Sequence, residues 1–458
     1  MTAIEGRPIL TAAQTRAAEA AAIAAGSSVD ALMLRAGEAI AVAVRRMASA
    51  NEILILCGPG NNGGDGYVAA VALREAGIAV RVAASAPPRT AAAIAACARW
   101  AAPIASLEEA QPAPVLVDAL FGTGLGRPLD AALVRQLGRA AAAAQITIAV
   151  DVPSGVATDD GTILSTPPHA TITLALGALK PSHLLQPAAR YMGAIEIVDI
   201  GLVADSAVRA MAAPVFVPPG PDDHKYTRGM VAIVAGAMAG AAELAAVSAM
   251  RAGAGYALLL TEAAGMPHAI VRRRFDAALL TDARIGAILV GPGLGRDAAA
   301  VGKLDAAFAA RRPLVIDGDA LHLVDQARLA AHDVPMILTP HGGEFGALFG
   351  EGSGSKIDRA RAAAAATGAV VVFKSADTVI AAPDGRVTVA TAANNWLSTA
   401  GTGDVLAGAC SAMLAGRHDP FAAAGAGVWL HADAARRCGA SFIADDVAAV
   451  LTAARAGR

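Results

Sequence analysis

Short runs of β-branched and other apolar residues alternate with alanine-rich stretches of helix length, and this alternation limits the chain to a small set of folds. A run of three to five such residues is typical of a strand, and the alanine-rich stretches between the runs favour helices. Strands that alternate with helices indicate βαβ units around a parallel sheet. In the first half of the chain, the runs lie at residues 53–56, 80–83, 115–117, 146–150 and 171–174.

A proline-rich segment divides this series into two. Pro218, Pro219, Gly220 and Pro221 can continue neither a helix nor a central strand, and the alternation restarts beyond them. We therefore expect two α/β domains, residues 1–213 and residues 221–458, each with its own core. In the second half, the runs lie at residues 231–234, 288–290, 314–316, 336–338 and 370–373.

The composition excludes several classes of protein. The 458 residues include 37 Lys and Arg against 39 Asp and Glu, so a net charge of −2 leaves no basic surplus for binding nucleic acid. The longest uncharged run, residues 161–179, contains Pro167 and Pro168, so we expect no membrane span. The 4 Cys form no CxxC pair, which argues against a disulfide framework and a zinc site. Because no signal peptide is recognisable, we expect a cytoplasmic protein, and we expect it to be a homo-oligomer.

A glycine-rich segment, CGPGNNGGDG at residues 57–66, follows the first strand run. Gly58, Gly60 and Gly63 satisfy GxGxxG, and such a turn presents backbone N–H groups and a helix N-terminus to a phosphate. The dinucleotide fingerprint also requires an acid near the end of the second strand, and residues 81–85 contain none. An ordinary dehydrogenase is therefore not indicated. A tight turn that needs glycine only for its geometry stays open as an alternative.

Two other strand runs end in an acid followed by a glycine-containing loop. Asp118 opens DALFGTGLGR at residues 118–127, and Asp151 opens DVPSG at residues 151–155. Ligands of open α/β sheets bind outside the carboxyl ends of the strands, so we expect both acids and the first glycine-rich segment to share one crevice. Either acid taken alone could instead be a helix N-cap.

In their order and spacing, these three segments resemble the NAD(P)H-hydrate epimerase family, and the similarity extends from about Leu10 to Val203. The resemblance implies a Rossmann-like three-layer αβα domain. It also implies a potassium ion held by Asn62, Asp118 and Ser154, which suits a hard cation because all three side chains offer oxygen. Asp151 would protonate or deprotonate the leaving and returning water. The residues implied to contact the hydrated dinucleotide are Asn61, Asn62, Gly63, Gly64, Asp65, Gly122, Thr123, Gly124, Leu125, Gly126, Arg127 and Asp151.

The second half carries GPGLG at residues 291–295 and, more specifically, AGTGDVLAG at residues 400–408. The amides of residues 401–403 at the start of an apolar helix can stabilise phosphoryl charge, and Asp404 adds a base at the same place. Asp404 could instead be a first-turn acid that complements the helix dipole. No GxxxxGK[ST] segment occurs, so a P-loop ATPase is excluded.

These segments resemble the ribokinase-like αβα fold and, more narrowly, the ADP-dependent NAD(P)H-hydrate dehydratases, over about Asp223 to Leu451. Further matches are LVIDGDAL, LTPHGGEF and VVFKSADTVIA. Gly318, Gly342 and Ser375 depart from the usual pattern of the family, and Ser375 could weaken or reposition the nucleotide. The residues implied to contact the hydrate are Ala241, Gly293, His341 and Asp404. Those implied to bind the adenine nucleotide are Lys374, Ser375, Ala376, Asp377, Thr378 and Gly403.

Together the two resemblances imply a bifunctional enzyme that repairs NADH-hydrate and NADPH-hydrate. The first domain would interconvert the R and S hydrates. The second would use ADP, with Mg²⁺ accompanying the nucleotide, to phosphorylate the hydroxyl beside N1, so that N1 expels phosphate and AMP remains. Asp404 is the candidate general base. One alternative is a ribokinase-like small-molecule kinase fused to a non-catalytic Rossmann-like domain. Another is a non-catalytic scaffold. The presence of Asp118, Asp151 and the complete NNGGD loop argues against it.

Overall fold

The structure, a computed structural model, describes residues 3–49, 51–265, 267–391, 394–416 and 418–457. The chain forms two compact units, Met1–Ala210 and Met211–Arg458. This division lies close to the proline-rich segment of the sequence. The assignment of one activity to residues 1–213 and another to residues 221–458 stays a prediction.

The first unit is built on a parallel sheet with the strand order β3-β2-β1-β4-β5-β6-β7, which confirms the predicted fold class. Its order reverses between β1 and β4, so the loops that follow these two strands open a crevice at the carboxyl edge of the sheet. The edge strands β3 and β7 were not predicted. The strands are β1 (Ile53–Cys57), β2 (Val80–Ala84), β3 (Ile104–Ser106), β4 (Val115–Ala119), β5 (Ile146–Val150), β6 (Ile172–Leu176) and β7 (Ala194–Val198).

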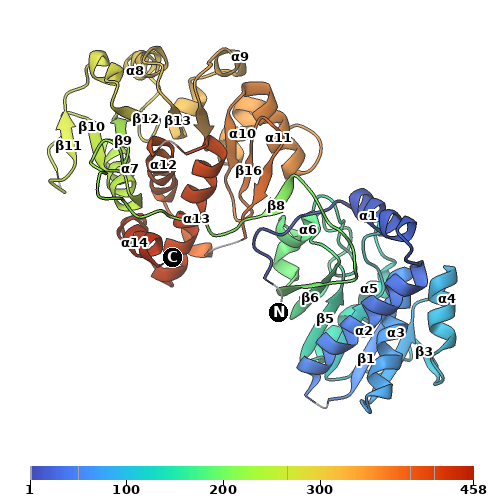
Figure 1. The fold of residues 1–458 in the computed structure, drawn as a ribbon. Helices are drawn as coiled ribbons and strands as arrows, with labels where there is room; N and C mark the ends of the chain where they lie inside the picture. Colours follow the sequence, from blue (N-terminus) through green and yellow to red (C-terminus); the bar gives the residue numbers. More distant parts are fainter. Residues whose placement is uncertain (1–2, 50, 266, 392–393, 417, 458) are drawn as a thin grey trace. The chain divides into compact units, whose positions relative to one another are not determined.

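Helices cover both faces of this sheet (Figure 1). One core joins α2, α3 and α4 to the sheet, and a second core joins α5 to the opposite face. The helices are α1 (Ala12–Ala24), α2 (Val29–Ala48), α3 (Asn61–Glu75), α4 (Ala91–Ala98), α5 (Ala131–Ala143), the short α6 (Pro181–Leu184) and the 3-10 helix η1 (Ala188–Tyr191). The unit ends with β8 (Val208–Ala210).

The second unit has a mixed sheet in which β9 to β17 take the order β11-β10-β9-β12-β13-β14-β15-β16-β17. The strands from β11 to β15 pair in parallel, and β16 pairs antiparallel with both β15 and β17. Pro383-Asp384-Gly385 turns the chain between β16 and β17, a signal that could have predicted this hairpin. The strands are β9 (Met230–Val234), β10 (Tyr256–Leu260), β11 (Val271–Arg273), β12 (Ile285–Val290), β13 (Leu314–Ile316), β14 (Met336–Leu338), β15 (Val370–Phe373), β16 (Val379–Ala381) and β17 (Val387–Val389).

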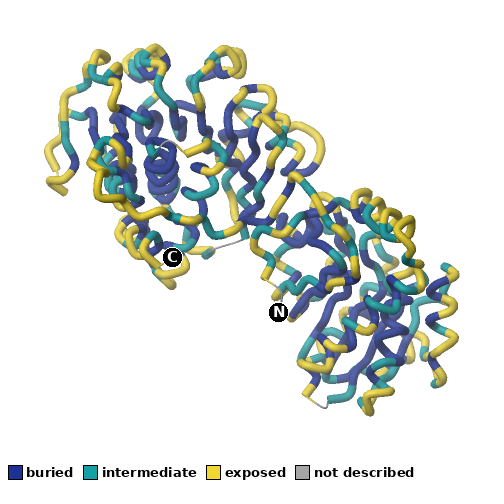
Figure 2. Tube along the Cα trace, viewed as in Figure 1, coloured by how far each residue is buried: buried dark blue, intermediate teal, exposed yellow. Residues whose placement is uncertain are grey.

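The core of the second unit surrounds α12 (Thr402–Ala415), a helix whose residues from Val405 onward are all buried (Figure 2). It packs with α7 (Ala239–Ala252), α13 (Pro420–Cys438) and α14 (Ala444–Ala456) against the sheet. A Cβ on Gly408 would lie 2.2 Å from the carbonyl oxygen of Ala245, so α7 and α12 touch backbone to backbone. The other helices are α8 (Ala298–Ala309), α9 (Gln326–Ala330), α10 (Gly342–Phe349), α11 (Lys356–Thr367), η2 (Ala277–Thr281), η3 (Gly318–His322) and η4 (Asn395–Leu397).

Within the described ranges, no single helix is both long enough and apolar enough to cross a bilayer. Taken together, helices Ala12–Ala24 and Val29–Ala48 have the length and composition of a membrane span, but a bend of 115° separates them.

The glycine-rich turn after β1 generates a stability prediction. A Cβ on Gly63 would lie 1.9 Å from the carbonyl oxygen of Gly58, whereas a Cβ on Gly60 meets nothing within 4 Å. Gly63→Ala should lower the free energy of unfolding of the full chain by about 1–3 kcal/mol, because backbone would have to move. Gly60→Ala, in the same loop, is the matched control. Gly60 is the N-cap of α3, where alanine is a poorer cap than glycine, so this change should cost less, about 0.5–1 kcal/mol. Urea denaturation measures both, and equal effects would contradict the close approach.

Candidate functional sites

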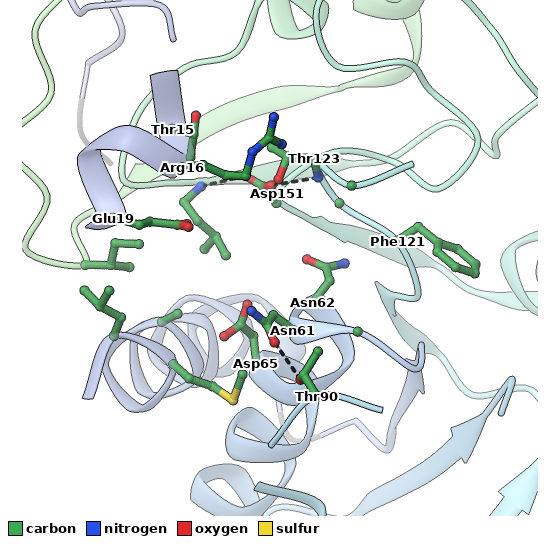
Figure 3. A pocket seen from close by; sticks show the side chains of 18 of the residues that line it. Thr15, Arg16, Glu19, Asn61, Asn62, Asp65, Thr90, Phe121, Thr123 and Asp151 are labelled. Atoms are coloured by element: carbon green, nitrogen blue, oxygen red, sulfur yellow. Dashed lines mark hydrogen bonds between the residues drawn. The ribbon is translucent and has the colours of Figure 1, made fainter. Parts of the chain in front are cut away.

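The first unit contains a cavity of about 500 Å³ at the carboxyl edge of its sheet (Figure 3). Its walls come from the loops after β1 and β4, from the ends of β5 and β6, and from helices α1 to α3. The sheet therefore brings together the strand-end loops that the sequence predicted to converge. The predicted site residues that line the cavity are Asn61, Asn62, Asp65, Gly122, Thr123, Gly124, Leu125 and Asp151.

Four other residues predicted to contact the dinucleotide do not line this cavity. Gly63 packs on the backbone of Gly58, and a Cβ on Gly64 would lie 2.5 Å from the methyl carbon of Met33. Both glycines thus allow α3 to pack closely. Gly126 and Arg127 lie further along the loop after β4, and their contact with substrate stays a prediction.

Asp151 lies at the end of β5 with a φ of +65°, a left-handed conformation that is rare outside glycine. Its carboxylate forms an ion pair with the ammonium of Lys180, and both side chains are buried. The same carboxylate accepts backbone N–H groups from Leu176 and Thr123, each at 3.3 Å. Strained backbone that several contacts hold in place is typical of functional sites. Sequence reasoning did not predict Lys180 as a site residue.

Asp65 has a different environment in the same cavity. Its side chain is 93% buried, and among the described residues no group hydrogen-bonds to its carboxyl or pairs with it. Burial raises its pKa well above the ordinary value, and the negative charges of Asp151 and Glu19 raise it further, while Lys180 opposes them. Burial also raises the pKa of Glu19. Sequence reasoning missed Thr15, Arg16 and Glu19, because α1 carries no motif.

Asp118 and Ser154 lie beneath the cavity rather than on its wall. The Asp118 carboxylate accepts the Ser154 hydroxyl at 2.7 Å and the Ser154 N–H at 2.9 Å. It is buried and forms no ion pair with any residue the structure describes, so burial raises its pKa. The side-chain nitrogen of Asn62 is also buried and has no hydrogen-bond partner. Of the three predicted potassium ligands, Asp118 and Ser154 are in direct contact.

In the second unit, the predicted base Asp404 lies in the first turn of α12. Nearby, the Lys374 ammonium is 2.6 Å from a carboxylate oxygen of Asp317 and 3.8 Å from one of Glu344. Burial raises the pKa of Asp404 to about 7, the Asp317 charge adds to this effect, and Lys374 opposes it. The sequence contained no signal for this arrangement of three acids around one lysine.

Two predicted hydrate contacts, Ala241 and Gly293, lie together. Gly293 has a φ of +59°, and a Cβ added there would lie 2.4 Å from the Met238 carbonyl oxygen and 3.0 Å from the Ala241 Cβ. His341 is the N-cap of α10, where its Nδ1 accepts the N–H groups of Gly343 and Glu344 at 3.0 and 3.2 Å. The rest of its imidazole ring is largely exposed.

The predicted nucleotide segment, residues 374–378, forms a turn after β15. Lys356, which sequence reasoning missed, donates hydrogen bonds to the Ser375 hydroxyl and to the Asp377 carboxylate. The Thr378 hydroxyl donates to the Ser375 carbonyl at 2.8 Å, and Ala376 is exposed. Ser375 therefore supplies a hydroxyl that links the turn to α11. A Cβ on Gly403 would lie 3.5 Å from the Lys374 ammonium, so the two predicted nucleotide contacts are neighbours.

Both units are α/β folds built on parallel strands. A family model described as NAD(P)H-hydrate dehydratase matches residues 231–454, and one described as YjeF-related protein N-terminus matches residues 29–182. The chain is 34% identical to the bifunctional NAD(P)H-hydrate repair enzyme Nnr of Thermofilum pendens, over 85% of this chain and 83% of the relative. It is 35% identical to the Mycobacterium tuberculosis enzyme of the same name, over 87% of each chain.

The chain belongs to the family of bifunctional NAD(P)H-hydrate repair enzymes. A solved ribokinase-like superfamily protein from Enterococcus faecalis is similar in fold, with a TM-score of 0.50 and 24% identity over 56% of this chain and 98% of its own. The predicted family and the predicted ribokinase-like fold of the second half are thereby confirmed.

The raised pKa of Asp404 predicts how its removal affects stability. Between the ordinary value of 3.8 and about 7, the folded chain holds a proton on this carboxyl that the unfolded chain has lost. Stability from this group therefore falls as pH rises through that window. The change in thermal midpoint caused by Asp404→Asn should therefore be more positive at pH 8 than at pH 4, by about 2–4 °C.

Asp445→Asn is the control, because Asp445 is an exposed acid in the first turn of α14. Its effect should not follow the same pH window. Scanning calorimetry across pH 4 to 8 compares the two variants, and a midpoint of Asp404→Asn that falls at pH 8 would show that the carboxylate is stabilised by the helix dipole instead.

Proposed function

We propose that the first unit epimerises the R and S hydrates of NADH and NADPH and that the second unit dehydrates the S hydrate at the expense of ADP. Membership of the family supports the overall activity. The observation that carries the division of labour is that each unit has its own acid at a strand or helix terminus with a perturbed environment, Asp151 in the first and Asp404 in the second. The activities are thus assigned to residues 1–213 and 221–458.

In the second unit, Asp404 is positioned to take a proton from the hydroxyl of the hydrate. A carboxyl with a pKa of about 7 is a suitable base, since about half of it is ionised at neutral pH and it binds the proton well. The N–H groups at the start of α12 stabilise charge on the phosphoryl group that the nucleotide transfers. Phosphate then leaves from the carbon beside N1 as the nitrogen lone pair forms a C=N bond. Loss of a proton from the adjacent ring carbon forms the C=C double bond of the restored ring and returns the lone pair to N1.

The nucleotide is expected beside residues 374–378 and Gly403, with Mg²⁺ on its phosphates. The Lys374 ammonium is already engaged by Asp317, so its contribution is to hold that acid and the start of α12 in place. A homo-oligomer and a cytoplasmic location are the expected assembly and compartment. The alternative of a small-molecule kinase is distinguished by its product, because a kinase leaves a stable phosphorylated compound and the dehydratase releases inorganic phosphate.

The dehydratase assignment is tested with Asp404→Asn, which keeps the size of the side chain and its place in α12. The loss of a general base should lower turnover of the S hydrate by about 10²- to 10⁴-fold. The measurement is the recovery of NADH absorbance with ADP and, in parallel, with ATP. If turnover stays near the wild-type rate, Asp404 is only a first-turn helix acid, and if ATP alone supports the reaction, ADP dependence is wrong.

Potassium fits the residues of the first unit. Asp118 is a buried carboxylate without an ion pair among the described residues, and a bound cation would offset the free-energy cost of its burial. Asn62, Asp118 and Ser154 supply the oxygen ligands that an alkali cation prefers. The ion would supply charge compensation and hold the loops after β1, β4 and β5.

The potassium assignment predicts that Asp118→Ala lowers epimerisation and abolishes its response to potassium. Dehydration of the S hydrate by the second unit should stay unchanged, which serves as the internal control for folding. Epimerisation is followed chromatographically in potassium and in tetramethylammonium chloride at equal ionic strength. Equal rates of the wild-type chain in the two salts would overturn the ion site.

A further inference from the structure

The cavity of the first unit holds two buried carboxyl groups in opposite electrostatic environments. Asp151 forms a buried ion pair with the Lys180 ammonium. Asp65 has no cationic partner and accepts no hydrogen bond from a described residue, although it is 93% buried and lines the cavity. Two carboxyl groups that share a site but differ in their surroundings, one with a cationic partner and one without, are the usual basis of an acid and base pair.

The carboxyl of Asp65 faces the cavity. Its protonation state depends on its burial and on the charged groups around it. Figure 3 shows Asp65 on the wall formed by α3, with Asp151 on a separate wall. The charged groups that share the cavity with it are Arg16 and Glu19 on α1, Asp151 at the end of β5, and Lys180 after β6. Lys180 is engaged by Asp151 and by the Leu176 carbonyl at 2.7 Å, and its charge lowers the pKa of Asp65 less than burial, Asp151 and Glu19 raise it. The neutral acid is the form that this position favours.

We propose that Asp65 is the general acid of the epimerase site and that Asp151, paired with Lys180, is its general base. The inference rests on the proposed function of the first unit and assigns its two proton transfers to separate residues. In the first transfer, the C–O bond at the carbon beside N1 breaks with its electron pair on oxygen. That oxygen takes the Asp65 proton and leaves as water, while the N1 lone pair forms a C=N bond.

The second transfer completes the inversion. Water adds to the opposite face of the now planar carbon, its proton passes to the Asp151 carboxylate, and N1 recovers its lone pair. Proton exchange with solvent then returns Asp151 to the ionised form and Asp65 to the neutral form, and the same residues exchange roles in the reverse reaction. Placement of the two carboxyls on separate walls suits attack and departure on opposite faces.

Glu19 is a positioning residue in this scheme. It lies on α1, outside residues 29–182 that the family model matches, and lines the cavity with its carboxylate near Asp65 and Asp151. Its negative charge disfavours ionisation of Asp65 and so keeps the acid protonated at higher pH. The role is electrostatic, and it differs from a packing role in its effect on the pH profile.

The first experiment uses Asp65→Asn in the full chain. The rate of conversion of R hydrate to S hydrate should fall by about 10²- to 10⁴-fold, while dehydration of S hydrate stays at the wild-type rate and shows that the chain is folded. A loss of less than tenfold would overturn the assignment of Asp65. If the wild-type chain itself does not epimerise the hydrate, the proposed function fails before this inference is reached.

The second experiment uses Glu19→Gln and distinguishes charge from packing. Activity that depends on a protonated Asp65 declines as pH rises through the pKa of that residue. Removal of the Glu19 charge should move this alkaline decline of kcat/KM to lower pH by about one unit. Glu38→Gln, an exposed acid on α2 that does not line the cavity, is the matched control and should leave the profile in place. A uniform loss at every pH for Glu19→Gln would overturn its electrostatic role.

Discussion

The buried ion pair between Asp151 and Lys180 is the interaction on which the first site depends. It joins the end of β5 to the segment after β6, and the Asp151 carboxylate also accepts the Thr123 N–H from the loop after β4. Three neighbouring strand ends are thereby fixed to one carboxylate. Burial of two charges is costly unless both are paired, so removal of either partner would leave an uncompensated charge in the wall of the cavity.

The second unit also contains a lysine among carboxylates, but there the acids outnumber the lysine. Lys374 is shared by Asp317 and Glu344, and Asp404 stands nearby with no ion pair among the described residues. One lysine for three acids leaves Asp404 in a negative surrounding, whereas one lysine for one acid leaves Asp151 neutralised. The same two residue types therefore produce a carboxyl that binds a proton near neutral pH in one unit and an ion-paired carboxylate in the other.

Sequence reasoning predicted the parallel sheets and the loops that meet at their carboxyl edges, because alternation of apolar runs and strand-end motifs are local signals. Eight of the predicted residues of the first site line one cavity. The features that sequence reasoning missed arise from contacts between segments far apart in the sequence. Glu19 comes from a helix without a motif, Asp317 and Lys356 act through partners distant in sequence, and the environment of Asp65 is created by burial that no spacing records.

The close approach of α7 and α12 limits which substitutions the second unit can tolerate. Because Gly408 lies against the Ala245 carbonyl, the position of α12 is fixed by main-chain atoms that every sequence shares. Exchange of one aliphatic residue for another elsewhere on α12 alters packing by a methyl group but leaves that contact as it is. The direction of α12, and with it the place of Asp404 in its first turn, is therefore little affected by most conservative substitutions, while Gly408 itself is among the least replaceable positions in the unit.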